Sequence, residues 1–127
     1  MPENFCQSAI RHFDDAHSLA SAESWDGAGH LIGFAAECAL KQGILATIQG
    51  IDSVHGHFPG LIEVAKKLLH QRRQTGLHTI LKKNNLMVGW KVELRYHATG
   101  SINKETYETW KQHTYSIFHA SGLRRQS

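Results

Sequence analysis

Apolar residues recur at helical spacing along most of this chain of 127 residues. The longest such stretch runs from Gly29 to Gln42, where apolar side chains extend around most of the helical cylinder and small residues lie among them. A helix that is apolar nearly all round is usually packed by neighbours on several sides. The pattern therefore predicts a buried central helix that ends near Thr47 and begins either after a turn at 24–27 or directly at Trp25.

Two more segments in the first 75 residues each show one apolar face. The segment from Phe5 to about Glu23 carries a single apolar stripe and predicts the first helix. A polar loop follows the central helix at 50–57. Pro59 then has the preferred position for the first turn of a third helix, which we expect to end near Gln74.

The last third of the chain combines short irregular elements with one longer helix. Residues 77–83 predict a short turn of helix, and 84–89 predict a loop. Residues 90–96 alternate like a strand, but no second strand is predicted to pair with them, so an extended or short helical connector is expected. Asn103 is a good cap for a last helix that ends near Ala120. Together these elements predict an all-α, four- to five-helix up-and-down bundle.

The composition fits one ordinary globular domain, which we expect to span 1–127 with a core at about 5–123. Hydrophobic residues make up 41% of the chain and charged residues 20%. Two cysteines, Cys6 and Cys38, do not make a disulfide framework. No apolar region follows Met1 as in a signal peptide, and no apolar run approaches the roughly 20 residues that span a bilayer. A cytoplasmic protein without membrane contact is therefore expected.

The net charge of +3 is mildly basic, and several basic residues stand in pairs. A folded basic patch could attract nucleic acid. The alternative is that these pairs only solvate helix faces. The pairs are Lys66-Lys67, Arg72-Arg73, Lys82-Lys83 and Arg124-Arg125.

Four short segments in a fixed order carry a further signal. They are Asp15-Ala-His-Ser-Leu19 followed by Trp25, Phe34-Ala-Ala-Glu-Cys-Ala-Leu-Lys41, His57-Phe-Pro-Gly-Leu61, and Leu94-Arg-Tyr96. This ordered set resembles the HEPN superfamily of small helical domains, found in prokaryotic toxins, nucleotide-associated proteins and defence systems. The likeness covers about residues 5–123. It implies a HEPN-like helical bundle that pairs into a homodimer.

Many members of that superfamily are metal-independent ribonucleases with an Arg, four to six residues, and then a His. The Arg would stabilise charge on the phosphate, and the His would act as general acid or base. This chain departs from the pattern, because the gap after Arg95 ends at positions 100–102, which hold no histidine, and His97 is too close. Arg73 and His78 do match the spacing. The catalytic candidates are therefore Arg95 with His97, or Arg73 with His78.

The binding candidates lie on the central helix and on the predicted connector. Glu37 and Lys41 stand four apart, as in a pair on one helix face; alternatively, Glu37 faces Arg95 across the bundle. Arg95 beside Tyr96 and near Trp90 could hold a phosphate and stack a base. The other interpretation is that Trp90 and Tyr96 belong to the core and that Arg95 forms a salt bridge.

Three functions follow from these features. The first is a divergent HEPN-like domain that binds nucleotide or RNA in a defence or toxin–antitoxin setting, with a cognate nucleotidyltransferase-like or antitoxin protein as partner. The second is a metal-independent endoribonuclease toxin. The third is a purely structural partner-binding module. We expect no cofactor and no metal, because His55 and His57 lack the further ligands of a zinc site.

Overall fold

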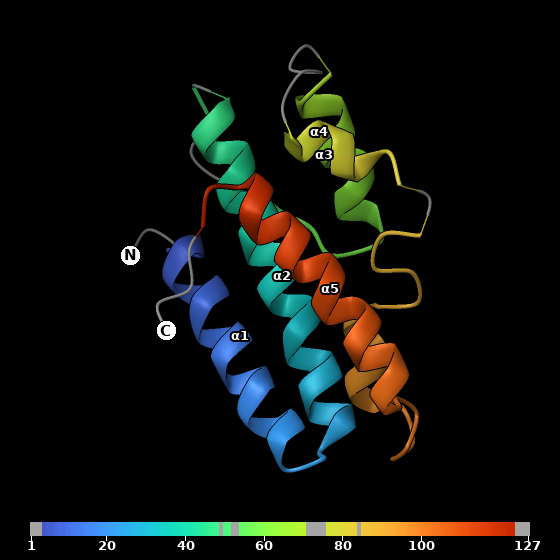
Figure 1. Cartoon of the computed structure of the whole chain (residues 1–127). Coiled ribbons are helices and arrows are strands. Elements are labelled where there is room, and N and C mark those ends of the chain that lie inside the picture. The colour runs from blue at the N-terminus through green and yellow to red at the C-terminus, as the bar shows by residue number, and fades with distance from the viewer. Residues whose placement is uncertain (1–3, 49, 52–53, 71–75, 84, 124–127) are drawn as a thin grey trace.

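The computed structural model describes residues 4–48, 50–51, 54–70, 76–83 and 85–123. Within these ranges every regular element is a helix, which confirms the predicted all-α bundle (Figure 1). The elements are α1 (Phe5–Ser21), α2 (Trp25–Thr47), α3 (Gly60–Leu68), α4 (Gly76–Leu81), the 3₁₀ helix η1 (Val92–Tyr96) and α5 (Lys104–Ala120).

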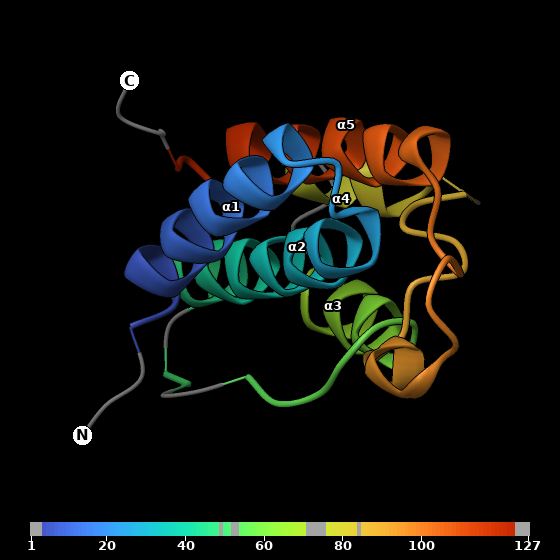
Figure 2. The same cartoon turned by 90° about the horizontal axis from the view of Figure 1, so that it is seen from below.

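The helix α2 is the centre of the bundle, as its apolar pattern predicts. It forms an antiparallel hairpin with α1 and also packs against α5, α3 and η1. Figure 2, which looks along the bundle, shows α1 and α5 on one side of α2 and α3 on another. The small and aliphatic residues of α2 are buried around most of the helix. No helix within the described ranges has both the length and the apolar content needed to cross a bilayer.

Most helix ends lie close to their predicted positions because local caps define them. The side chain of Asn4 accepts a hydrogen bond from the Gln7 N–H at 3.0 Å, and Asn103 accepts one from the Thr106 N–H at 2.8 Å. The third helix is shorter than predicted. It ends at Leu68, where the backbone tightens into a turn, and the predicted end at Gln74 lies outside the described residues.

The connector at 90–96 is held against α2 by a tryptophan that packs on a glycine. The indole of Trp90 is 1% exposed, and an ideal Cβ on Gly33 would lie only 1.8 Å from its Cε2 atom. The indole N–H also donates a hydrogen bond to the Gly29 carbonyl at 3.0 Å. A side chain at position 33 would occupy the space of the indole, so the glycine is what allows η1 to approach the central helix.

A second contact ties the chain to α2 at residues 100–102, after η1. The carboxylate of Asp26 accepts hydrogen bonds from the Gly100 N–H at 2.7 Å and the Ile102 N–H at 3.0 Å. These bonds favour the charged carboxylate and lower the pKa of Asp26 below its ordinary value. The segment between Trp90 and Ile102 is therefore tied to α2 at both ends, and η1 is presented between the two ties.

Candidate functional site

The first part of the site is a buried carboxylate that holds a histidine at the surface. Glu37 is 2% exposed, and its Oε1 atom is 2.9 Å from His57 Nδ1. Its Oε2 atom accepts a hydrogen bond from the Phe58 N–H at 2.7 Å. Burial raises the pKa of Glu37, while the hydrogen bonds from His57 and Phe58 act in the opposite direction. The side chain of His57 remains 52% exposed.

These contacts correct both predicted partners of Glu37. Within the described ranges, the salt bridge of Glu37 is to His57, not to Lys41, whose ammonium instead lies 5.5 Å from the centre of the Phe5 ring. Lys41 still lowers the pKa of Glu37 through its charge, but this is the smallest of the effects. Within the described ranges, Arg95 makes no ion pair with Glu37. The loop before α3 folds back over α2 and places His57 beside Glu37, where Lys41 or Arg95 was expected.

The second part is a cluster of imidazoles around one phenylalanine on α2. The ring centre of Phe34 lies 4.8 Å from that of His30, 5.8 Å from that of His12 and 6.3 Å from that of His57. We call these four residues the histidine–aromatic face. Trp90 lies beneath it, 5.3 Å from Phe34 and stacked on His30. Trp90 is thus a core residue that supports this face, and it is too buried to stack on a base as predicted.

The surroundings of His30 and His12 favour the neutral form of both imidazoles. Burial lowers the pKa of His30, and the positive charge of Arg95 lowers it further. Burial and the charge of Arg11 likewise lower the pKa of His12. The Nδ1 atom of His30 is buried without a hydrogen-bond partner among the described residues. The positive charge of Arg95 on η1 therefore affects the pKa of His30, a member of the histidine–aromatic face.

The third part is the exposed pair on η1 that the sequence singled out. Arg95 is exposed, and its Cζ atom lies 4.9 Å from the centre of the Tyr96 ring. Tyr96 is 75% exposed, and His97, directly after η1, is also exposed. Within the described ranges, no carboxylate lies within 4.0 Å of the Arg95 guanidinium. Arg95 and Tyr96 therefore form an accessible cationic and aromatic surface.

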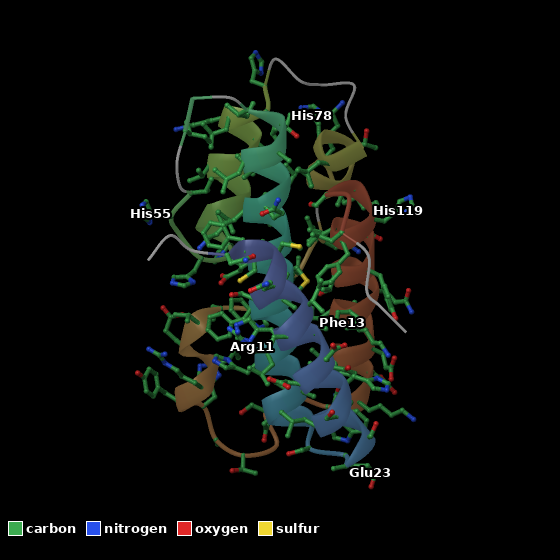
Figure 3. The ribbon with its side chains drawn as sticks, turned by 90° about the vertical axis from the view of Figure 1, so that its left-hand side faces the viewer. Arg11, Phe13, Glu23, His55, His78 and His119 are labelled. Atoms are coloured by element: carbon green, nitrogen blue, oxygen red, sulfur yellow. The ribbon has the colours of Figure 1, made fainter. Side chains whose placement is uncertain are left out.

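The remaining catalytic candidates lie elsewhere. Arg73 lies outside the described residues, and His78 is only 9% exposed, on α4. Figure 3 shows His78 at the upper end of the bundle, whereas η1 lies at the lower left, and Figure 1 shows the same separation. Among the described residues, no group of three His, Cys, Asp or Glu side chains is arranged to hold a metal ion.

The sequence interpretation missed His12, His30 and Phe34 as members of the site. His30 and Phe34 stand four apart on one helix, a spacing that brings side chains together. That spacing is the signal that could have revealed the pair. The contribution of His12 from α1 depends on how the hairpin packs.

Comparison of the chain with known protein families, with curated proteins and with solved structures found no match.

Proposed function

We propose that this chain is a divergent HEPN-like domain that binds the phosphate and base of a nucleotide or RNA at Arg95, Tyr96 and the adjoining histidine–aromatic face. The observation that carries the proposal is the exposed Arg95 guanidinium, which has no carboxylate partner within the described ranges and lies over an exposed Tyr96 ring. An arginine fork is suited to phosphate oxygens, and an exposed tyrosine ring offers a surface on which a base can stack.

The neutral histidines support the same proposal. Burial lowers the pKa of His30 most, and the charge of Arg95 lowers it further, so an incoming phosphate would relieve the repulsion between that charge and a protonated imidazole. Protonation of His30 would then add a second cation beside the ligand. Binding of a phosphate and of a proton at this surface would therefore favour each other.

The biological setting proposed here rests on the HEPN resemblance. It consists of a homodimer in a cytoplasmic defence or toxin–antitoxin system, with a cognate nucleotidyltransferase-like or antitoxin protein as partner. Arg95 on an exposed short helix would be available either to an RNA or to such a partner.

A second candidate function, metal-independent RNA cleavage, has one specific observation in its favour. His57 is half exposed, and Glu37 holds its Nδ1 atom, which leaves Nε2 for proton transfer. His57 is therefore a candidate general base or acid, in addition to the predicted His97. The spacing of the family motif does not apply to His57, because His57 and Arg95 come from different segments.

Binding is tested by the fluorescence anisotropy of a labelled single-stranded RNA with the wild type and with Arg95→Ala and Tyr96→Ala. Both variants should bind about tenfold or more weakly, since a stacked base contributes about 1–3 kcal/mol. Lys104→Ala, which removes an exposed charge at the start of α5, should bind like the wild type. Equal affinity of Arg95→Ala and the wild type would contradict the proposal.

Cleavage is tested separately with end-labelled RNA in the presence of a metal chelator. The wild type is compared with His57→Ala, His97→Ala and Arg95→Ala. Loss of cleavage in His57→Ala, with RNA binding intact, would assign the proton-transfer role to His57. RNA that binds but stays uncut with the wild type would leave binding as the function.

A further inference from the structure

A groove lies beside α3, away from the residues of the proposed nucleotide site. It has a volume of about 540 Å³ and is lined by residues of α3, by Pro59 before it, and by Lys83 and residues 86–91. Figure 1 shows α3 and the segment 86–91 on the same side of the bundle. Neither Arg95 nor Tyr96 lines the groove. Its volume lies within the range of roughly 300–1,000 Å³ found for sites that hold small organic molecules.

The wall of the groove toward the core is apolar. Its accessible surface comes from the exposed Pro59, the half-buried Ile62 of α3 and Val88, which is 62% exposed, whereas Leu86, Met87 and Trp90 are almost fully buried. The accessible apolar side chains provide a surface on which an aromatic or branched aliphatic group can pack. The groove can therefore remove the apolar body of a ligand from water.

The outer part of the groove is cationic. Three exposed lysines, Lys66, Lys83 and Lys91, line it, and Glu63 is the one carboxylate among its lining residues. Glu63 is 3.7 Å from Lys66, in a pair of exposed side chains that contributes little. Within the described ranges, Lys83 and Lys91 have no carboxylate within 4.0 Å. Two unneutralised ammonium groups therefore flank an apolar wall.

We propose that this groove binds an amphipathic organic anion, a small molecule with an apolar body and one carboxylate, sulfonate or phosphate group. The apolar body packs against Pro59, Ile62 and Val88, and the anionic group binds to Lys83 and Lys91. The charge of the lining residues selects an anion over a neutral or cationic molecule. This site is independent of the RNA surface on η1, so either can fail without the other.

A matched pair of fluorescent probes tests this proposal on the wild-type chain. Anilinonaphthalene sulfonate has an apolar body and one anionic group, and N-phenylnaphthylamine has the same body without the sulfonate. The anionic probe should bind at one site per chain and change the tryptophan fluorescence of the chain. It should bind about tenfold or more tightly than the neutral probe, because a hydrogen bond to a charged group contributes about 1.5–3 kcal/mol.

Two double variants locate the site. Lys83→Glu with Lys91→Glu should weaken binding of the anionic probe about tenfold or more. Lys67→Glu with Lys104→Glu makes the same change in net charge at two exposed lysines that do not line the groove, and it should bind the probe like the wild type. Circular dichroism and thermal unfolding verify that all four substitutions leave the fold intact.

Several results would overturn the proposal. Equal affinity for the two probes would show an apolar patch without anion selection. Equal loss in both double variants would show an effect of net charge alone. Probe binding that falls as the chain self-associates, followed by light scattering, would assign the groove to contact between two copies of the chain.

Discussion

The carboxylate of Glu37 and the imidazole of His57, twenty residues apart in the chain, are joined at 2.9 Å. The same carboxylate accepts the N–H of Phe58 through its other oxygen. One buried side chain of the central helix thus anchors the loop that precedes α3. The exposed position of His57 is a consequence of this anchor, and so is the position at which α3 begins.

Glu37→Gln should lower the free energy of unfolding by about 1–3 kcal/mol, measured by urea denaturation near neutral pH. The glutamine keeps the shape of the side chain but offers one acceptor oxygen in place of two, so it can accept from the Phe58 N–H only if its N–H₂ donates to His57 Nδ1 in place of the charged carboxylate interaction. Glu63→Gln, which removes one carboxylate of an exposed pair, should change the free energy by less than about 0.5 kcal/mol. Equal stability of the two variants would show that Glu37 does not anchor the loop.

His113 should make the protein less stable in mild acid. Its Nδ1 atom accepts a hydrogen bond from the Met87 N–H at 3.0 Å, which requires the neutral ring. Burial lowers the pKa of His113, and the charge of Lys83 lowers it further. The unfolded chain therefore binds the proton more readily than the folded one. The stability that this group contributes is fully present above its ordinary pKa of 6.5 and is lost as the pH falls through the lowered value.

The measurement is thermal unfolding at about pH 7.5 and about pH 5.5, on either side of the ordinary histidine pKa. His113→Asn places an amide oxygen close to the position of Nδ1 and does not titrate, so the loss of stability in acid should be smaller in this variant. His12 and His30 act in the same direction as His113, and the raised pKa of Glu37 acts in the opposite one. All three remain in the variant. An unchanged difference between the two pH values would contradict the role of His113.

Gly33→Ala should destabilise the protein by about 1–3 kcal/mol, because the new methyl group would overlap the indole of Trp90. The indole cannot move freely, since its N–H is bonded to the Gly29 carbonyl. Denaturation followed by tryptophan fluorescence measures the effect. At Gly60 an added Cβ would meet no atom within 4 Å, so Gly60→Ala should leave stability unchanged or slightly higher. A stable Gly33→Ala variant would mean that the connector packs differently.

Arg95→Ala should reduce the salt dependence of RNA binding. If the guanidinium contacts one phosphate, the slope of log affinity against log salt concentration should fall in magnitude by about 1. Arg95→Lys keeps the charge and should retain the slope, while losing affinity because an ammonium lacks the two-pronged geometry. Titrations at several salt concentrations measure both quantities. An unchanged slope in Arg95→Ala would exclude a phosphate contact at this residue.

The helices of this protein could be predicted from sequence because each has a local signal. The apolar stripe of α1, the nearly all-apolar α2 and the Asn103 cap of α5 are readable within a few turns. The end of α3 was less readable, since the polar residues after Leu69 contain no Gly or Pro to mark a stop before Gly76.

The site was harder to predict because its contacts join distant segments. Lys41 was the nearest opposite charge to Glu37 along the helix, but a loop that returns over α2 brings His57 closer. Trp90 stood beside Arg95 in the sequence, yet Gly33 admits its ring into the core while Tyr96 stays outside. Sequence spacing indicated the right connector, and packing decided which of its aromatic residues faces solvent.

The two hydrogen bonds that Asp26 accepts span 74 and 76 residues of the chain. Contacts between residues so far apart in the chain form late in folding. The α1–α2 hairpin joins neighbouring segments and can form early. A nascent chain that has emerged only as far as α3 therefore carries the α1–α2 hairpin. The side of α2 that contains Gly33 is not yet covered by the indole of Trp90. Until Trp90 and the segment at 100–102 have left the ribosome, that apolar side of α2 is open to contact with chaperones or with other unfinished chains.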